Sequence, residues 1–214
     1  MERFEPIFEA LNASGARYVV VGGVAVNLHG HTRFTKDLDL VLDLEPVVAR
    51  KALETLAGLG FRPKVPVAIT DFADPLLREQ WATERNMLVF QLFRDASRLT
   101  VDLFVRYPID FDMLWMDATR VILPRAEIRL ASLEHLIAMK REAGGPHVPT
   151  VQSTAVNLDS FSAAERSRLE LQLRATPAER LRDLEAMWDF NEVVWANNPR
   201  VLRIAERLWA MQGR

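Results

Sequence analysis

The sequence contains no cysteine, which excludes disulfides, thiolate metal ligands and cysteine nucleophiles. It also lacks an apolar run of the roughly 18 to 20 residues that a membrane span requires. The first ten residues, MERFEPIFEA, have no cationic region followed by an apolar stretch, so no signal peptide is expected. We therefore expect a cytoplasmic protein with no membrane partner, whose metal ligands, if any, are oxygen atoms or histidines.

The chain also lacks an excess charge of either sign. It has 27 basic and 29 acidic side chains and a formal net charge of −2. No global field attracts it to nucleic acid, although a local basic patch would still do so. Lysine is scarce, with 4 residues against 23 arginines. The length of 214 residues suits one domain of about 150 residues with an appendage.

Two kinds of sequence pattern follow one another along the chain. Helical spacing and alternating β-branched runs share residues 1–145, which predicts an α/β (α+β) domain with a mixed β-sheet flanked by helices. Residues 146–160 are rich in glycine, proline, serine and threonine and have no periodicity, so they are expected to form a linker. Residues 161–214 carry helix caps at Ser162 and Thr176, and we expect a small helical appendage there.

The chemistry concentrates in the run GGVAVNLHGHTRFTKDLDLVLD, residues 22–43. On a strand Asp37 and Asp39 share one face, while Leu38 and Leu40 face the core. Asp102 is a third acidic residue within an otherwise apolar strand. Three carboxylates on neighbouring strands would hold one or two divalent ions, with Mg²⁺ preferred and Mn²⁺ as the alternative. The competing interpretation of Asp37 and Asp39 is the solvated face of an edge strand.

Several residues beside these carboxylates are of the types that bind phosphate. Gly22 and Gly23 end one predicted strand and begin a helix, where backbone N–H groups are accessible to phosphate oxygens. Arg33 and Thr35 add a guanidinium and a hydroxyl shortly before Asp37. We expect these four residues to bind phosphate oxygens of a substrate. His29 and His31 lack the spacing of a helical metal pair and are expected to shape the loop.

In order and spacing, Gly22, Gly23, Asp37, Asp39 and Asp102 resemble the nucleotidyltransferase superfamily that includes polymerase β. The longer run GGVAVNLHGHTRFTKDLDL resembles the bacterial toxin nucleotidyltransferases of the AbiEii group and the related MenT toxins. The resemblance covers residues 5–145. It implies Mg²⁺-dependent transfer of an NMP from an NTP to an acceptor hydroxyl with release of pyrophosphate, and for MenT the acceptor is tRNA. It also implies an antitoxin partner.

The same resemblance extends to LIAMKREAG, where Lys140 matches a lysine that binds phosphate in these toxins. The chain departs from the toxins beyond this point, because GGPHVPTVQ stands where they continue with Arg-Pro-x-Asp and an acidic helix. Three alternatives therefore stay open. The first is an antibiotic-modifying enzyme with a small hydroxylated acceptor, and the second is a nucleotide-binding module without catalysis. In the third, the C-terminal helices cover the site, bind an antitoxin or mediate self-association.

Overall fold

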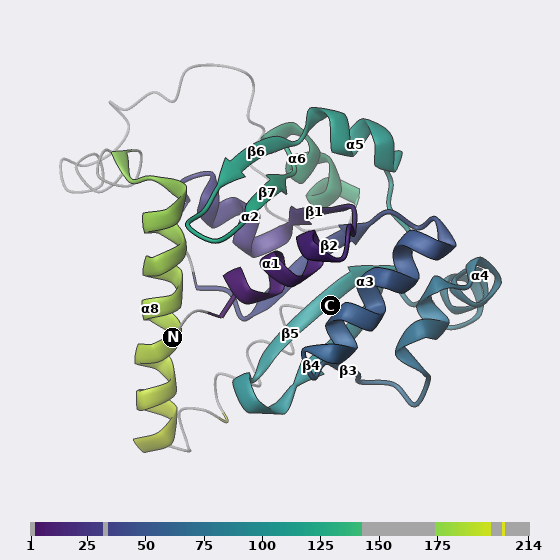
Figure 1. Ribbon diagram of the computed structural model, residues 1–214, viewed down its shortest axis with the longest axis horizontal. Coiled ribbons are helices and arrows are strands. Elements are labelled where there is room, and N and C mark those ends of the chain that lie inside the picture. The colour runs from purple at the N-terminus through teal and green to yellow at the C-terminus, as the bar shows by residue number, and fades with distance from the viewer. Residues whose placement is uncertain (1–2, 32–33, 143–173, 198–202, 204–214) are drawn as a thin grey trace.

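The computed structural model describes residues 3–31, 34–142, 174–197 and 203 (Figure 1). Its strands form one seven-stranded sheet in the order β3-β4-β5-β2-β1-β7-β6. The pairs β2–β5 and β1–β7 are parallel, and the other neighbouring strands are antiparallel. The strands are β1 (Tyr18–Val21), β2 (Asp37–Leu42), β3 (Arg62–Pro63), β4 (Val89–Arg94), β5 (Leu99–Phe104), β6 (Thr119–Ile122) and β7 (Glu127–Leu130).

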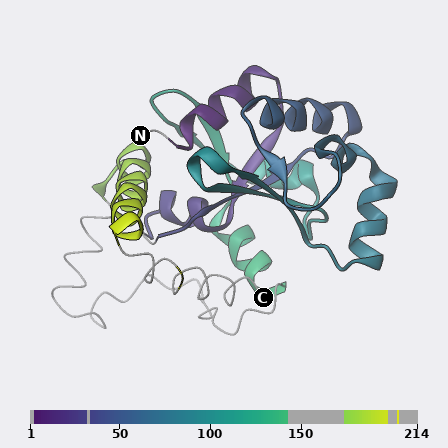
Figure 2. The ribbon, with the colours of Figure 1, turned by 90° about the horizontal axis from the view of Figure 1, so that it is seen from below.

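Helices lie on both faces of this mixed sheet, which confirms the predicted α/β architecture. In Figure 2, α1 and α3 (purple and blue) lie above the sheet and α6 (green) lies below it. The α-helices are α1 (Glu5–Ala13), α2 (Gly22–Leu28), α3 (Pro46–Gly58), α4 (Pro75–Glu84), α5 (Phe111–Asp117), α6 (Leu133–Glu142) and α8 (Pro177–Asn197), and two 3₁₀ turns span Ile69–Ala73 and Asp95–Ser97. No helix among the described residues is long and apolar enough to span a bilayer.

The two faces of the sheet differ in what they bury. Strand alternation sends Val20, Leu40 and Leu103 into the larger core cluster, which also contains the buried side chains of α1 and α3. Val21 and Val41 belong to a smaller cluster on the opposite face, together with side chains of α5 and α6. Because the residues of β2 and β5 alternate in the same way, their aspartates lie on the face of the smaller cluster.

β2 is the central strand of the sheet, with three strands on either side of it. Leu38 and Leu40 are fully buried, as expected from the alternating pattern. The edge-strand interpretation of Asp37 and Asp39 is therefore wrong, since a central strand has both backbone edges paired. A solvated edge does not explain two carboxylates at these positions.

Helix α8 packs on the N-terminal part of the chain. Leu181, Leu184, Trp188 and Trp195 are buried in the same core cluster as β1 and β2. The predicted capping box is present, because the Thr176 N–H donates to the Glu179 carboxylate at 2.7 Å. The predicted linker 146–160 and both of its boundaries lie outside the described residues, so the division into 1–145, 146–160 and 161–214 stays a prediction.

Candidate functional site: a row of carboxylates on the sheet

The three predicted aspartates lie on one face of the sheet. β2 and β5 run parallel, with Asp39 directly opposite Asp102 and Asp37 opposite Thr100. Side chains at positions two apart on a strand point the same way, so Asp37 and Asp39 share the face of Asp102. The row continues on the next strand, because Gln91 of β4 is opposite Asp102. The parallel pairing therefore brings together acidic residues that are more than sixty positions apart in the sequence.

Gly22 and Gly23 lie against the Asp39 carboxylate. The Gly23 N–H donates to Asp39 Oδ2 at 3.3 Å. Gly22 has a φ of +60°, and a Cβ built at this residue would overlap the carboxylate of Asp39. A left-handed φ already favours glycine, and the contact with Asp39 leaves no room for any side chain. The local fold therefore requires Gly22 so that Asp39 can occupy its observed position.

Gln91 and Lys64 hold Asp102 from the other side of the row. Gln91 Nε2 donates to Asp102 Oδ2 at 3.0 Å. Lys64, the residue that follows β3, donates from Nζ to Gln91 Oε1 at 3.0 Å. The second carboxylate oxygen, Asp102 Oδ1, is buried without a hydrogen-bond partner within the described structure. A buried carboxylate oxygen in this condition is costly unless a cation or a donor approaches it.

The electrostatics of the row favour the binding of a cation. Burial raises the pKa of Asp102 to about 6, and the charge of Asp37 adds to this effect. The Gln91 hydrogen bond and the charges of Lys64 and Lys36 act in the opposite direction on the same pKa. Burial also raises the pKa of Asp37, although Lys36, Lys64 and a hydrogen bond with Thr100 oppose this rise. A bound divalent ion would lower both pKa values by stabilising the ionised carboxylates.

The donor atoms of this row suit Mg²⁺, which prefers carboxylate oxygens. The buried, unpartnered Asp102 Oδ1 is an oxygen that a cation would complete. Within the described ranges, no three His, Asp or Glu side chains are already gathered as a metal site. Asp39 Oδ2 is turned toward Gly23 and Asp102 Oδ2 toward Gln91. Shared coordination of one ion would therefore require a rotation of these carboxylates.

Of the other predicted phosphate-binding residues, the structure describes Thr35 and Lys140 but not Arg33. Thr35 lies two residues before Asp37, and its carbonyl accepts a hydrogen bond from Trp188 at 2.9 Å. Lys140 is exposed on α6, whose Leu136 and Met139 pack against the cluster on the carboxylate face. Arg33 lies outside the described residues. The roles of Gly22, Gly23, Arg33, Thr35 and Lys140 in nucleotide binding stay predictions.

The predicted role of His29 in shaping the loop agrees with its contact. Its Nε2 lies 2.8 Å from the carbonyl oxygen of Ala131. Gln91, Lys64 and Lys36 were not among the predicted site residues. Gln91 carried the same sequence signal as Asp102, because it is a polar residue within the apolar strand VFQLF. Lys64 carried no local signal, since its place beside Gln91 depends on the pairing of β3 with β4.

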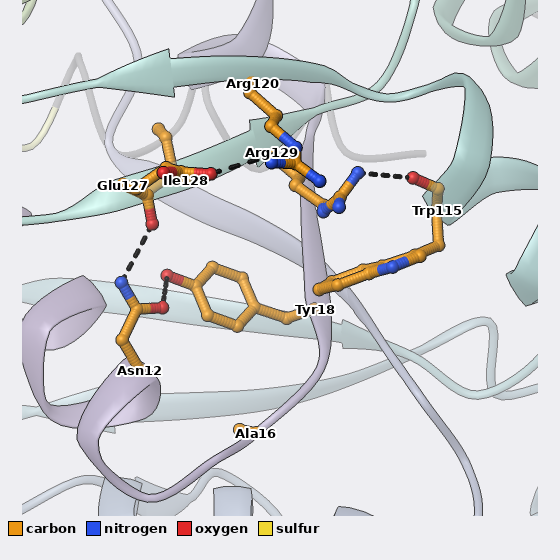
Figure 3. Close-up of a pocket in the computed structure, with 8 residues that line it drawn as sticks. All are labelled: Asn12, Ala16, Tyr18, Trp115, Arg120, Glu127, Ile128 and Arg129. Carbon is orange, nitrogen blue, oxygen red and sulfur yellow. Dashed lines mark hydrogen bonds and ion pairs between the residues drawn. The ribbon is translucent and has the colours of Figure 1, made fainter.

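A separate pocket of about 210 Å³ lies near the start of β1 (Figure 3). Gly22 and the carboxylates lie at the other end of this strand, because Gly22 follows its last residue, Val21. Its polar groups are paired with one another. The Tyr18 hydroxyl donates to Asn12 at 3.0 Å, and Arg129 donates to the Trp115 carbonyl at 2.8 Å. The pocket is therefore distinct from the carboxylate row. It is lined by Asn12, Ala16, Tyr18, Trp115, Arg120, Glu127, Ile128 and Arg129.

Comparisons with known proteins identify the family of the chain. The sequence profile described as "Nucleotidyl transferase AbiEii toxin, Type IV TA system" matches residues 7–143. No curated protein sequence matches the chain. Among solved structures, the chain is similar to the crystal structure of ANT(2")-Ia in complex with adenylyl-2"-tobramycin, with 15% identity, a TM-score of 0.41, and coverage of 87% of this chain and 94% of that one.

The solution structure of ANT(2'')-Ia is a second similar structure, with 14% identity, a TM-score of 0.40, and coverage of 90% of this chain and 95% of that one. The profile match spans well over half of the sequence and includes Gly22, Gly23 and all three aspartates of the row. The activity of such a family is the transfer of nucleotides. The chain therefore belongs to the AbiEii family of nucleotidyl transferase toxins.

Proposed function

We propose that the protein is an Mg²⁺-dependent enzyme that transfers an NMP from an NTP to an acceptor hydroxyl and releases pyrophosphate. The observation that carries this proposal is the carboxylate row, in which Asp39 and Asp102 are opposite each other and Asp37 shares their face. Gly22 and Gly23 lie at one end of the row, and a side chain at Gly22 would displace Asp39. Asp102 Oδ1 adds a buried acceptor that lacks a partner in the described structure.

Asp37, Asp39 and Asp102 would hold the Mg²⁺, with Mn²⁺ as the alternative ion. When bound, such an ion neutralises charge on the phosphates and favours deprotonation of the acceptor hydroxyl. The acceptor oxygen forms a bond to the α-phosphorus, and the bond from that phosphorus to the bridging oxygen of the β-phosphate breaks. We assign the hydroxyl proton to Asp102, because its carboxylate lies on the same face of the sheet as Asp37 and Asp39. The electron pair of the broken bond leaves with pyrophosphate.

The triphosphate would lie between the two glycines and the lysines of the site. The backbone N–H groups of Gly22 and Gly23 and the side chains of Arg33, Thr35 and Lys140 are the groups that we assign to it. Lys64 is a further cation that we assign to the triphosphate. Its Nζ donates to Gln91, and Gln91 in turn donates to Asp102, so the ammonium lies close to the carboxylates. Charge-assisted contacts of this kind position the α-phosphate for attack by the acceptor.

For the acceptor we propose the 3′-terminal hydroxyl of tRNA. The support is the AbiEii profile match, together with the resemblance of the run in residues 22–40 to MenT toxins. A toxin of this kind would act in the cytoplasm, where its NTP and tRNA are found. Its neutralisation would require an antitoxin, and the C-terminal helices are the segment that we assign to antitoxin binding or self-association.

Labelled NTPs, Mg²⁺ and total tRNA would test this proposal. The wild-type protein should label the RNA, EDTA should stop the reaction, and Asp39→Ala should lose the activity. Asp95→Ala is the matched control, since Asp95 lies at the tip of the β4–β5 hairpin with its side chain 71% exposed. Labelling that persists in Asp39→Ala would contradict the assigned site.

Replacing tRNA by aminoglycosides in the same assay would test the acceptor. Label on the aminoglycoside and none on tRNA would overturn the RNA assignment while retaining the chemistry. Calorimetry with each NTP tests the alternative without catalysis. An NTP affinity that does not depend on Mg²⁺, without pyrophosphate release in any acceptor mixture, would replace the enzyme by a nucleotide-binding module.

A further inference from the structure

Helix α8 makes directed contacts with the segment that leads from α2 into the carboxylate row. Trp188 Nε1 donates to the carbonyl of Thr35 at 2.9 Å. Closer to the start of α8, Arg180 donates to the carbonyl of Leu28 at 2.6 Å. These two carbonyls lie at opposite ends of the loop between α2 and β2. A single helix, from a distant part of the sequence, therefore holds both ends of this loop.

Aromatic packing reinforces the hold on the end of the loop nearest to β2. The ring of Phe34 lies 5.5 Å from the Trp188 ring and 6.2 Å from the Trp195 ring, measured between centroids. Trp188 and Trp195 are in turn packed edge to face at 6.2 Å. Aromatic pairs at these separations favour specific relative orientations. Phe34 is consequently oriented by two indoles of α8 rather than by its own loop.

Arg3, in the N-terminal segment, packs against the Trp188 ring. The Arg3 guanidinium lies 5.1 Å from the centre of the Trp188 ring. Arg3 also pairs with Asp189 at 2.9 Å and Glu192 at 2.7 Å, and its side chain is only 3% exposed. Buried Glu185 accepts from the Arg3 backbone N–H at 2.6 Å. The indole is therefore held in place on the α8 side, and its N–H is a fixed donor toward Thr35.

Gly30 also lies beside α8. It has a φ of +109°, and a Cβ built there would be in ordinary van der Waals contact with the Arg180 guanidinium, at 3.4 Å. Only Lys36 separates Thr35 from Asp37, the first carboxylate of the row. A displacement of the Thr35 carbonyl would therefore reach the row through two peptide units. Misplacement by about 1 Å is enough to reduce catalysis about 100-fold.

We infer that Trp188 is a positioning residue for the nucleotide site, acting through its N–H bond to Thr35. The expected effect on activity rests on the proposed function. Trp188 itself lies on α8, away from the strands that carry the carboxylates. α8 is then a component of the active unit, and Leu28 and Thr35 depend on it for their positions. A helix that only fills the core would stabilise the fold without setting the geometry of the row.

Trp188→Phe retains an aromatic ring and removes the N–H donor together with part of the buried indole. The smaller ring should lower Tm. At a temperature well below the Tm of the variant, we expect kcat to fall about tenfold, and we expect weaker Mn²⁺ binding in a direct titration of the metal. Phe190→Ala is the control on the same helix, since Phe190 is 69% exposed and should leave both values unchanged. Phe34→Leu is the second variant, which loses ring packing but retains the Trp188 donor.

Unchanged kcat and unchanged Mn²⁺ affinity in Trp188→Phe would overturn the inference, as would a fall in Tm without either effect. Should Trp188→Phe not fold, the same readings are taken on Trp188→Met, which also lacks the N–H donor and whose flexible side chain fills a core gap. Phe34→Leu, which retains the donor, should weaken Mn²⁺ binding less than either variant of Trp188. A wild-type protein without transferase activity would refute the proposed function instead. In that case the Mn²⁺ titration still decides whether Trp188 positions the carboxylate row.

Discussion

Asp102→Asn should change the pH dependence of folding stability. Burial raises the pKa of Asp102 from the ordinary 3.8 to about 6. Between these values the folded chain binds a proton that the unfolded chain has released, so the free energy of unfolding falls as pH rises. The difference of about 2 pKa units, at about 1.4 kcal/mol for each, is a loss of about 3 kcal/mol above pH 6. The asparagine of the variant cannot titrate, so the variant should not show this loss.

Urea denaturation at pH 4.5 and 7.5, in EDTA, measures the effect. Over this interval we expect the wild type to lose about 2 kcal/mol more stability than Asp102→Asn. The two proteins are compared by the pH dependence of their free energy of unfolding rather than by its value at one pH. The buried asparagine amide destabilises the variant at every pH, and this constant cost does not change the slope. Asp95→Asn, at the exposed tip of the same hairpin, should retain the wild-type slope. Parallel curves for the wild type and Asp102→Asn would refute this reasoning.

The same variant tests metal linkage. At pH 7.5, Mg²⁺ at tenfold its Kd should stabilise the wild type by about 1.4 kcal/mol, because the ion binds only the folded chain. Asp102→Asn should gain much less, since it lacks one carboxylate of the row. Equal stabilisation of both proteins by Mg²⁺ would place the ion elsewhere.

Three further predictions concern the groups around the carboxylates. Gly22→Ala should reduce activity about 100-fold, since its methyl displaces Asp39, whereas Gly15→Ala, with a φ of +73° and open space, should show only the backbone cost of about 1 kcal/mol in urea denaturation. Gln91→Leu should move the acidic limb of the pH–rate profile to higher pH, because the lost donor had lowered the pKa of the carboxyl beside it. Lys64→Met should raise KM for the NTP about tenfold in steady-state assays, with a smaller change in kcat.

Much of the fold was predictable because the signals were local. Alternation at period 2 placed Asp37 and Asp39 on one face, and the alternating Leu38 and Leu40 are buried as expected. Serine before a helical run is a typical N-cap, and the Ser132 Oγ accepts a hydrogen bond from the His135 N–H at 3.2 Å. The hairpin of β4 and β5 also follows from its own residues, with a short turn at 95–97. Each of these features depends on neighbours within a few positions of the chain.

The features that the sequence did not predict depend on pairing between distant segments. The strand β6 has only a weak local signal, because TRVI is short and lies at the edge of the sheet. The central place of β2 follows from its parallel pairing with β5, which no local pattern specifies. Lys64 reaches Gln91 only because β3 pairs with β4. The contact of Trp188 with Thr35 spans 153 positions. The helical pattern of α8 indicates an apolar face but does not specify which segment packs against it.

The most direct test of the carboxylate site is a crystal of the protein grown with a non-hydrolysable NTP analogue and Mn²⁺, with anomalous scattering measured at the manganese edge. The account predicts an anomalous peak between Asp39 and Asp102, within coordination distance of Asp102 Oδ1 and of a phosphate oxygen. Manganese bound elsewhere, with Asp39 still on Gly23 and Asp102 Oδ1 still without a partner, would contradict it.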